Sequence, residues 1–297
     1  MQKEMQPIFP AQKLQRPMYV AGLFSGGASS IRYMLNDPNH GKLYQFVVAA
    51  THNPEASGIE HLKPHMPVVR FQEPEEYFAE HGLDPKNQYS KYGYWGYVLD
   101  LIEGRFDPDF VVLSGLMKIL RYPFVRETDK NGREWGSGLY DNHVFNVHPA
   151  DLAVLSGQYV KRINAGDMKT KDVATLRAAD NLQRKFKGAD AVRDALLANE
   201  ILLRSSIHIA TRNVDEGSII VRSPPVIADV GPEKAPELQE WMKWNCDGPA
   251  FVKAMELVAS GRIAVDDSTV FMLQEDKVWR ELPYGGYSME GVLTSSI

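Results

Sequence analysis

Short apolar runs that read as buried β-strands recur through the first half of the chain, and helix-like segments separate several of them. The runs are MYVAGLF at 18–24, FVVAATHN at 46–53, PVVRF at 67–71, FVVLSGL at 110–116 and HVFNVHP at 143–149. Strands buried on both faces have this near-continuous apolar character, and alternation with helices favours parallel pairing. The sequence therefore predicts an α/β fold, with a mostly parallel, twisted sheet and helices on both faces, similar to a Rossmann fold.

The second half of the chain adds helices and a pair of strands. Apolar residues at helical spacing predict helices over 170–186, 189–200 and about 235–260, the last ending at Gly261, and SSIHIATRN (205–213) and GSIIVRSPPVI (217–227) read as an antiparallel pair. The tail after Arg262 is expected to be less regular. We divide the chain into an extended, proline-rich arm at 1–17, a main domain at 18–263 with a basic insertion at 156–187, and a C-terminal extension at 264–297.

The composition excludes several classes of protein. The 297 residues are 44% hydrophobic and 24% charged, as in ordinary globular proteins, and the formal net charge of -5 provides no basic field for nucleic acid. The single cysteine, Cys246, excludes an internal disulfide framework. No apolar run approaches the length of a membrane span, and residues 1–17 lack a signal-peptide core. We therefore expect a cytoplasmic monomer or homodimer that binds neither nucleic acid nor membrane.

The loop after the first predicted strand combines glycines with hydroxyl groups. It consists of Ser25, Gly26, Gly27, Ala28, Ser29 and Ser30. Such a loop lets backbone amides and a helix N-terminus approach an anion, which indicates a substrate-binding role; the alternative is a tight turn in which Ser29 or Ser30 caps the helix. Dinucleotide and P-loop spacings are absent. The loop also resembles the SGG-x-D-S loop of ATP pyrophosphatases, with Ser29 where that family has its aspartate.

Asn146 and His148 stand two residues apart at the end of a predicted strand that Pro149 closes. Alternate residues of a strand share a face, so both side chains lie together at its carboxyl end, where α/β sheets bind their ligands. A carboxamide beside an imidazole suits a carbonyl that becomes a tetrahedral oxyanion. Such a histidine needs a carboxylate partner, and Asp215, in a turn before a later strand, is the best candidate.

Together these motifs resemble the folate-dependent formyltransferase family, in particular the glycinamide ribonucleotide (phosphoribosylglycinamide) formyltransferases. The resemblance runs in order over roughly residues 18–263: FSGGASS, VVLSGLMKILRYPFV (111–125), NVHP, the long segment 188–226 and VASGRI. It implies the formyltransferase fold, a purine-biosynthesis-type one-carbon transferase, and 10-formyltetrahydrofolate as co-substrate. The formyl group would pass to the amine of a small, phosphorylated acceptor.

The resemblance also implies a role for each matching residue. Asn146 and His148 would stabilise the oxyanion, and Asp215 would orient His148 and a proton-relaying water. The folate carrier would lie against Met117, Lys118, Ile119 and Leu120 and the loop containing Thr211 and Val214, with Lys118 near its glutamate tail. His208 is expected to be structural. The remaining histidines show no ligand spacing, so we expect no metal.

Several positions depart from the family pattern, so we expect the acceptor to be glycinamide ribonucleotide or a related amine. Gly27, Ala28 and Ser30 replace the loop residues usual in purine-pathway members, and Asp247 stands near an acceptor-binding glutamate position. The insertion at 156–187 carries eight basic residues against three acidic ones, so we expect it to attract a phosphorylated acceptor. A surface elaboration or a dimer contact is the alternative.

Other functions remain open at this level. A sugar-nucleotide amine N-formyltransferase would use the same site on a different phosphorylated acceptor. An ATP-pyrophosphatase-like enzyme is favoured only by the SGGASS loop, and a non-catalytic folate-binding protein would not need Asn146, His148 and Asp215. We expect neither a methionyl-tRNA formyltransferase nor a formyltetrahydrofolate deformylase, because only short segments flank residues 18–263.

Overall fold

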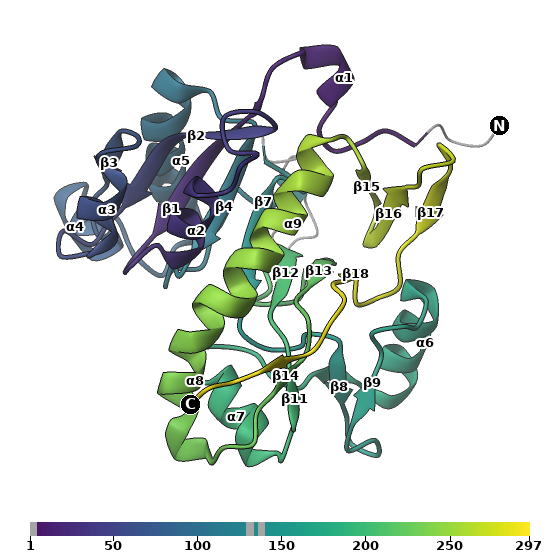
Figure 1. The fold of residues 1–297 in the computed structure, drawn as a ribbon. Helices are drawn as coiled ribbons and strands as arrows, with labels where there is room; N and C mark the ends of the chain where they lie inside the picture. Colours follow the sequence, from purple (N-terminus) through teal and green to yellow (C-terminus); the bar gives the residue numbers. More distant parts are fainter. Residues whose placement is uncertain (1–4, 129–133, 136–139) are drawn as a thin grey trace. The chain divides into compact units, whose positions relative to one another are not determined.

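The computed structural model describes residues 5–128, 134–135 and 140–297, which form two compact units (Figure 1). The N-terminal unit comprises residues 16–146 together with 210–213. The C-terminal unit comprises the start of the chain up to residue 15, residues 147–209 and residues 214–297. This division cuts across the arm, main domain and extension expected from the sequence, which therefore stay predictions.

The N-terminal unit is built on parallel strands. Its elements are β1 (Met18–Phe24), α2 (Ser29–Leu35), β2 (Tyr44–Thr51), α3 (Gly58–Leu62), β3 (Val68–Arg70), α4 (Pro74–Glu80), α5 (Gln88–Phe106), β4 (Phe110–Ser114), β5 (Glu127–Thr128), β6 (Glu134–Trp135) and the first part of β7 (Val144–His148). The sheet order is β7-β4-β1-β2-β3, and every neighbouring pair is parallel. The strands predicted from apolar runs are confirmed, with small differences at their ends.

Helices cover both faces of this parallel sheet. On one face, Leu23 and Val111 pack in a core with Val98 and Ile102 of α5. On the other face, Gly22 leaves room for α2, because a Cβ there would lie 2.5 Å from Cδ1 of Ile31. Both faces of the strands are apolar because both are covered, which is why these runs show no alternation. The predicted fold class is confirmed.

The C-terminal unit combines small sheets with helices. Its elements are α1 (Ala11–Leu14), β8 (Val154–Ser156), β9 (Ile163–Asn164), α6 (Thr170–Asp180), β10 (Gln183–Arg184), α7 (Ala191–Leu197), β11 (Leu202–Leu203), β12 (Ser206–Ile209), β13 (Ile219–Arg222), β14 (Val226–Ile227), η1 (Pro232–Lys234), α8 (Ala235–Met242), η2 (Lys243–Asp247), α9 (Gly248–Ala259), β15 (Ile263–Asp266), β16 (Thr269–Leu273), β17 (Trp279–Glu281), β18 (Tyr287–Ser288) and β19 (Leu293–Thr294). The antiparallel pairing predicted for 205–213 and 217–227 is confirmed as β12 with β13. The predicted long helix is also confirmed, and the π-helical turn η2 joins α8 to α9 in one rod (Figure 1).

Two segments fold differently from expectation. The helix predicted over 170–186 is shorter: α6 ends at Asp180, where Asn181 takes a left-handed conformation, and residues 183–184 form β10. With β8 and β9, β10 makes a small sheet that shares a core with α6, including Leu155 and Val173. The tail after Arg262 was expected to be less regular, and this is wrong: β15, β16 and β17 form an antiparallel sheet. Buried Val270 and Met272 alternate with less buried neighbours in β16, a pattern too short to stand out in the sequence.

The N-terminal arm is more than an extended segment. It contains the one-turn helix α1, and the side chain of Phe9 is buried. The amide of Ile8 donates to the carbonyl of Ile263, which fastens the arm to the first strand of the tail sheet. Within the part of the chain that the structure describes, no helix has the length and apolar character needed to cross a bilayer.

Gly58 in α3 packs so closely against the 25–30 loop that there is no room for a side chain at position 58. Its amide donates to the carbonyl of Gly26 at 3.1 Å, and a Cβ at this position would lie 2.9 Å from atoms of Phe24, Gly26 and Ala28. We therefore expect Gly58→Ala to lower the free energy of unfolding by roughly 1–3 kcal/mol, because a backbone carbonyl must move.

The matched control is Gly104→Ala on the exposed side of α5, where an added methyl group meets nothing within 4 Å. There the free energy of unfolding should rise by about 0.5–1 kcal/mol, because alanine loses less backbone entropy in a helix. Urea denaturation of both variants measures the difference. Equal effects of the same sign would contradict the packing argument.

Candidate active site

Strand β7 carries the Asn-x-His pair at its carboxyl end, as predicted. Asn146 lies opposite Leu113 of β4 in the parallel register and is half-buried, whereas His148 is 4% exposed. The alternation of side chains along a strand puts both residues on the same side of β7. A hydrogen-bond donor and an imidazole therefore follow each other at the end of one strand, before the chain turns at Pro149.

The C-terminal unit brings His148 and Asp215 together, and it adds a second histidine. The Nδ1 atom of His148 lies 3.4 Å from Oδ2 of Asp215, and Nε2 of His208, from β12, lies 3.5 Å from Oδ1. All three side chains are buried. The expectation that His208 is structural did not foresee this position against the Asp215 carboxylate. The only feature of the sequence that pointed to His208 was the spacing Ser206-x-His208, which places both side chains on one side of a strand.

The end of the basic insertion encloses this charged group. The carbonyl oxygen of Phe186 lies 2.8 Å from Nε2 of His148, and the amide of Gly188 donates to Oδ2 of Asp215 at 3.0 Å. Arg184 donates to the backbone carbonyls of Asp215 and, at 2.9 Å, of Gly217. Asp215 has a φ of 56°, a left-handed conformation that costs energy for a residue other than glycine. The Arg184 and Gly188 contacts hold the carboxylate in this turn.

Burial and charge act in opposite directions on this group. Burial alone would raise the pKa of Asp215, but hydrogen bonding to His208 and the nearby His148 ring hold that pKa below its usual range. Burial lowers the pKa of His148, while the Asp215 carboxylate acts to raise it. Burial outweighs the carboxylate, so the pKa of His148 stays below its usual value, whereas Asp215 is ionised at neutral pH.

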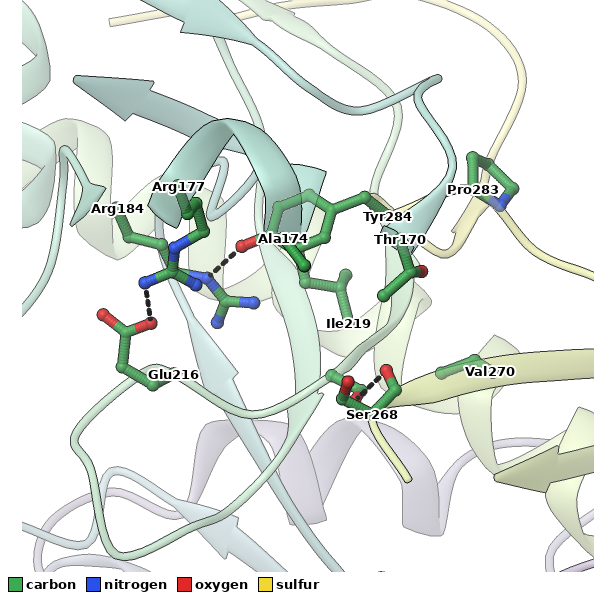
Figure 2. Close-up of a pocket in the computed structure, with 11 residues that line it drawn as sticks. Thr170, Ala174, Arg177, Arg184, Glu216, Ile219, Ser268, Val270, Pro283 and Tyr284 are labelled. Carbon is green, nitrogen blue, oxygen red and sulfur yellow. Dashed lines mark hydrogen bonds and ion pairs between the residues drawn. The ribbon is translucent and has the colours of Figure 1, made fainter. Parts of the chain in front are cut away.

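A cavity of about 120 Å³ lies beside the turn at 215–217 in the C-terminal unit (Figure 2). It is lined in part by Arg177, Arg184, Glu216 and Tyr284. Arg177 pairs with Glu216 at 2.8 Å, and Nε of Arg184 donates to the Tyr284 hydroxyl at 3.1 Å (dashed lines in Figure 2). Residues of the insertion (156–187) and of the tail (264–297) thus line one cavity, next to the 215–217 turn to which Arg184 is hydrogen-bonded.

Most basic residues of the insertion already have partners. Arg177 and Lys187 bind Glu216, and Arg162 and Lys185 lie within ion-pair distance of Glu200. Three exposed lysines, which take part in no ion pair among the described residues, remain to attract an anion: Lys161, Lys169 and Lys171.

The 25–30 loop belongs to the N-terminal unit and follows β1 directly. Helix α2 begins after Ala28, which has a φ of 51°, and no side chain caps it, so the interpretation of Ser29 or Ser30 as a cap does not hold. The amide of Ser30 donates instead to the Ser114 hydroxyl at 3.2 Å. No hydrogen bond among the described residues uses the amides of Gly26 and Gly27. Two donors of the loop are therefore available to an anion.

The 117–120 segment follows β4 and is divided between surface and core. Met117 and Ile119 are exposed, whereas Leu120 is buried in the core beneath α5. Lys118 lies 2.9 Å from Oε2 of Glu73, an ion pair that the sequence did not predict.

The second predicted folate segment lies at 211–214. Thr211 hydrogen-bonds to the carbonyl of Asn213, and Val214 is exposed. A contact of these residues with the folate carrier stays a prediction.

Asp247 lies inside the C-terminal unit. It ends the π-helical turn η2, is 5% exposed, and accepts a hydrogen bond of 2.5 Å from the Ser205 hydroxyl. In this position the carboxyl group supports the packing of η2 against residue 205, and it does not face solvent. Among the described residues, no group of three or more His, Cys, Asp or Glu side chains is placed to hold a metal ion.

The fold has known counterparts. The chain superimposes on glycinamide ribonucleotide transformylase 1 of Symbiobacterium toebii with a TM-score of 0.61 at 17% identity, over 87% of this chain and 95% of that one. It superimposes on the phosphoribosylglycinamide formyltransferase of Coxiella burnetii with a TM-score of 0.62 at 16% identity, over 93% of this chain and 100% of that one. The chain has the formyltransferase fold. A formyltetrahydrofolate deformylase from Pseudomonas putida KT2440 also matches, with a TM-score of 0.54 at 17% identity, over 87% of this chain and 70% of that one.

Similarity at the level of sequence is weaker. No protein-family model matches the chain. The trifunctional purine biosynthetic protein adenosine-3 of Gallus gallus is 24% identical over 251 residues, which make up 84% of this chain and 19% of that protein. The chain thus spans about a fifth of the length of this curated relative. These comparisons confirm the fold implied by the resemblance, whereas the roles of individual residues stay predictions.

The burial of Asp247 leads to a pH-dependent prediction. Burial raises the pKa of this carboxyl group from 3.8 to about 7, so the folded protein holds a proton that the unfolded chain releases. Between about pH 4 and pH 7 the folded state binds a proton that the unfolded state has lost, so the free energy of unfolding falls as pH rises through this range. Asp247→Asn should remove this loss, so at pH 8 the variant should have a free energy of unfolding higher than that of the wild type by on the order of a few kcal/mol. Denaturant titrations at pH 5 and pH 8 measure it, and an equal change at both pH values would contradict the assignment.

Proposed function

We propose that the chain transfers a formyl group from 10-formyltetrahydrofolate to the primary amine of a small, anionic acceptor. The observation that carries the proposal is the His148–Asp215 pair, at 3.4 Å, on a strand end that also bears Asn146. The formyltransferase fold supports it, because the structures with this fold include enzymes that use formylated folate. The chain would accordingly be a one-carbon transferase.

The chemistry follows from the charges around His148. The acceptor nitrogen attacks the formyl carbon, and the carbonyl oxygen becomes an oxyanion in the tetrahedral intermediate. The Asn146 amide and a protonated His148 stabilise that oxygen, because a positive charge and a fixed donor interact more strongly with an anion than with the carbonyl. The intermediate collapses when the folate nitrogen leaves with a proton, while the acceptor nitrogen loses one.

Asp215 would assist by partly offsetting the effect of burial, which lowers the pKa of His148. The negative charge that develops on the oxyanion would favour the protonated imidazole further. The carbonyl of Phe186 fixes the ring by bonding Nε2, and Gly188 fixes the carboxylate. His208 contributes a second imidazole on the other carboxylate oxygen, which helps to keep Asp215 ionised. His208 would therefore be a positioning residue in this reaction.

The donor and acceptor would use the segments named by the resemblance. Met117, Ile119, Thr211 and Val214 would contact the pterin, and the buried Leu120 would support the 117–120 segment from the core. Lys118 would have to exchange Glu73 for the glutamate tail. The free amides of Gly26 and Gly27 would bind a phosphate or another anionic group of the acceptor. The acceptor itself could be glycinamide ribonucleotide, a related amine or a sugar-nucleotide amine.

The first test of the proposal is a turnover assay. The chain is incubated with 10-formyltetrahydrofolate and a panel of phosphorylated amines, and release of tetrahydrofolate and formylation of the amine are measured. Tetrahydrofolate release with formate as the product would indicate hydrolysis, and ATP consumption would indicate a pyrophosphatase. Folate binding without turnover of any amine would support a non-catalytic binding protein.

His148 and Asp215 should behave as one unit in that assay. We expect His148→Ala and Asp215→Asn each to lower kcat by about 100-fold or more, and the double variant to lose little beyond the larger single loss, because coupled catalytic groups are non-additive. His65→Ala, at an exposed histidine of the N-terminal unit, is the control and should stay near wild type. Fully additive losses would contradict a shared role.

The exposed lysines of the insertion allow a test of acceptor recruitment. Replacing Lys161, Lys169 and Lys171 by Gln together should raise the KM for an anionic acceptor about 2–10-fold and weaken its salt dependence, because long-range attraction is screened by salt. The kcat and the folate KM should not change. The control replaces the exposed Lys13, Lys42 and Lys277, with the same loss of charge. Equal effects of the two triple variants would show a general effect of net charge.

A further inference from the structure

A second constellation of catalytic side-chain types lies entirely within the N-terminal unit. The hydroxyl of Ser25 lies 2.8 Å from Nε2 of His52, and Nδ1 of the same ring lies 2.6 Å from Oε1 of Glu73. Serine, histidine and a carboxylate in this order and at these distances form the arrangement that activates a hydroxyl nucleophile in serine hydrolases. None of these contacts involves Asn146, His148 or Asp215.

The strand register explains why residues so far apart in sequence meet. Phe24, the last residue of β1, pairs with Thr51, the last of β2, and Thr51 pairs with Arg70, the last of β3. Ser25 and His52 are therefore the first residues beyond two neighbouring strand ends. Glu73 follows shortly after β3, immediately before α4. All three lie at the carboxyl edge of a parallel sheet, where such folds place their active sites.

The hydrogen bonds define which atom holds each proton. A carboxylate only accepts, so Nδ1 of His52 donates to Glu73, and in the neutral imidazole Nε2 then accepts the proton of the Ser25 hydroxyl. Lys118 lies 2.9 Å from the second oxygen of Glu73. Although burial alone would raise the pKa of Glu73, Lys118 and His52 hold that pKa below its usual value. The carboxylate is therefore ionised and fixes the imidazole in the tautomer that a general base requires.

Donors for a developing oxyanion lie next to the nucleophile. The amide of the residue that follows the nucleophile is the usual donor in such sites, and here it belongs to Gly26. The Gly26 and Gly27 amides have no hydrogen-bond partner among the described residues. Ser25 is half-buried and Gly26 is exposed, so a substrate can reach the hydroxyl. The exposed Met117, whose amide donates to Ser25 Oγ at 3.1 Å, offers apolar surface beside it.

We propose that Ser25, His52 and Glu73 form a nucleophilic triad that cleaves short-chain acyl esters. Ser25 Oγ forms a bond to the acyl carbon while its proton passes to Nε2 of His52, and the ester C–O bond breaks as the alcohol leaves with that proton. Water then attacks the acyl-serine, giving a proton to His52, and the acid leaves as Ser25 regains its proton. This activity goes beyond the proposed formyl transfer.

The test is covalent labelling of the full chain with a fluorophosphonate, with the modified residue located by mass spectrometry, and hydrolysis of p-nitrophenyl acetate. We expect one adduct, on Ser25, and a burst of p-nitrophenol. Ser25→Ala should abolish the adduct, and His52→Gln should slow its formation at least about 100-fold. Glu73→Gln, at a partly exposed side chain that should not disturb folding, should slow it by a smaller factor.

Matched controls separate the triad from general reactivity. Ser57→Ala removes a neighbouring exposed serine, and His61→Ala removes an exposed histidine in α3, and both should be labelled at the wild-type rate. Thermal melting confirms that each variant is folded. Absence of an adduct on Ser25, or equal labelling of wild type and Glu73→Gln, would overturn the proposal.

The outcome is distinguishable from failure of the formyl-transfer proposal. His148→Ala should be labelled on Ser25 as fast as wild type, whatever its effect on tetrahydrofolate release. A chain that labels on Ser25 but formylates no amine would support the triad alone. A chain that formylates an amine but gives no adduct would support formyl transfer and reject the triad.

Discussion

The parallel register of the N-terminal unit is the constraint on which its chemistry depends. Phe24 at the end of β1 pairs with Thr51 of β2 on one side and with Ser114 of β4 on the other, so three loops begin at one level of the sheet. Ser25 Oγ consequently lies within hydrogen-bonding distance of both His52 and the Met117 amide. Hydrogen-bonded strands are rigid, so the polar residues that directly follow them are held in fixed positions by the sheet.

In the C-terminal unit the corresponding constraint is the cost of burying a charge. Asp215 is buried and ionised, and such a group is stable only when its oxygens are satisfied. Two imidazoles and the Gly188 amide satisfy them, and Arg184 holds the backbone of the turn. The inserted segment is therefore part of the structure around the candidate site, because it supplies Arg184, Phe186 and the approach to Gly188.

The two candidate sites share one kind of chemistry, attack of a nucleophile on an acyl carbon. In the proposed formyl transfer, the nucleophile is an amine supplied by the acceptor, and the protein would supply Asn146 and His148. In the proposed ester cleavage, the protein would supply the nucleophile itself, with His52 as the base. The difference follows from the partners: the ring nitrogens of His148 face a carbonyl and a carboxylate, whereas Nε2 of His52 faces a hydroxyl. The same side chain would therefore act through its charge in one site and as a base in the other.

The sequence by itself determined the fold class and most strands of the parallel sheet, and it nominated Asn146, His148 and Asp215 as a candidate set, but it did not indicate the tail sheet. Each of these depends on local patterns: apolar runs, helical spacing, and motifs that keep their order along the chain. Tertiary structure decided what joins those elements. Ser25 and His52 are 27 residues apart and His52 and Glu73 are 21 apart, separations that carry no periodic signal. Their meeting depends on which strands are neighbours and in what register. The contacts of Arg184 and His208 with the Asp215 turn, and of Phe186 with His148, likewise exist only after the chain has folded around a buried charge.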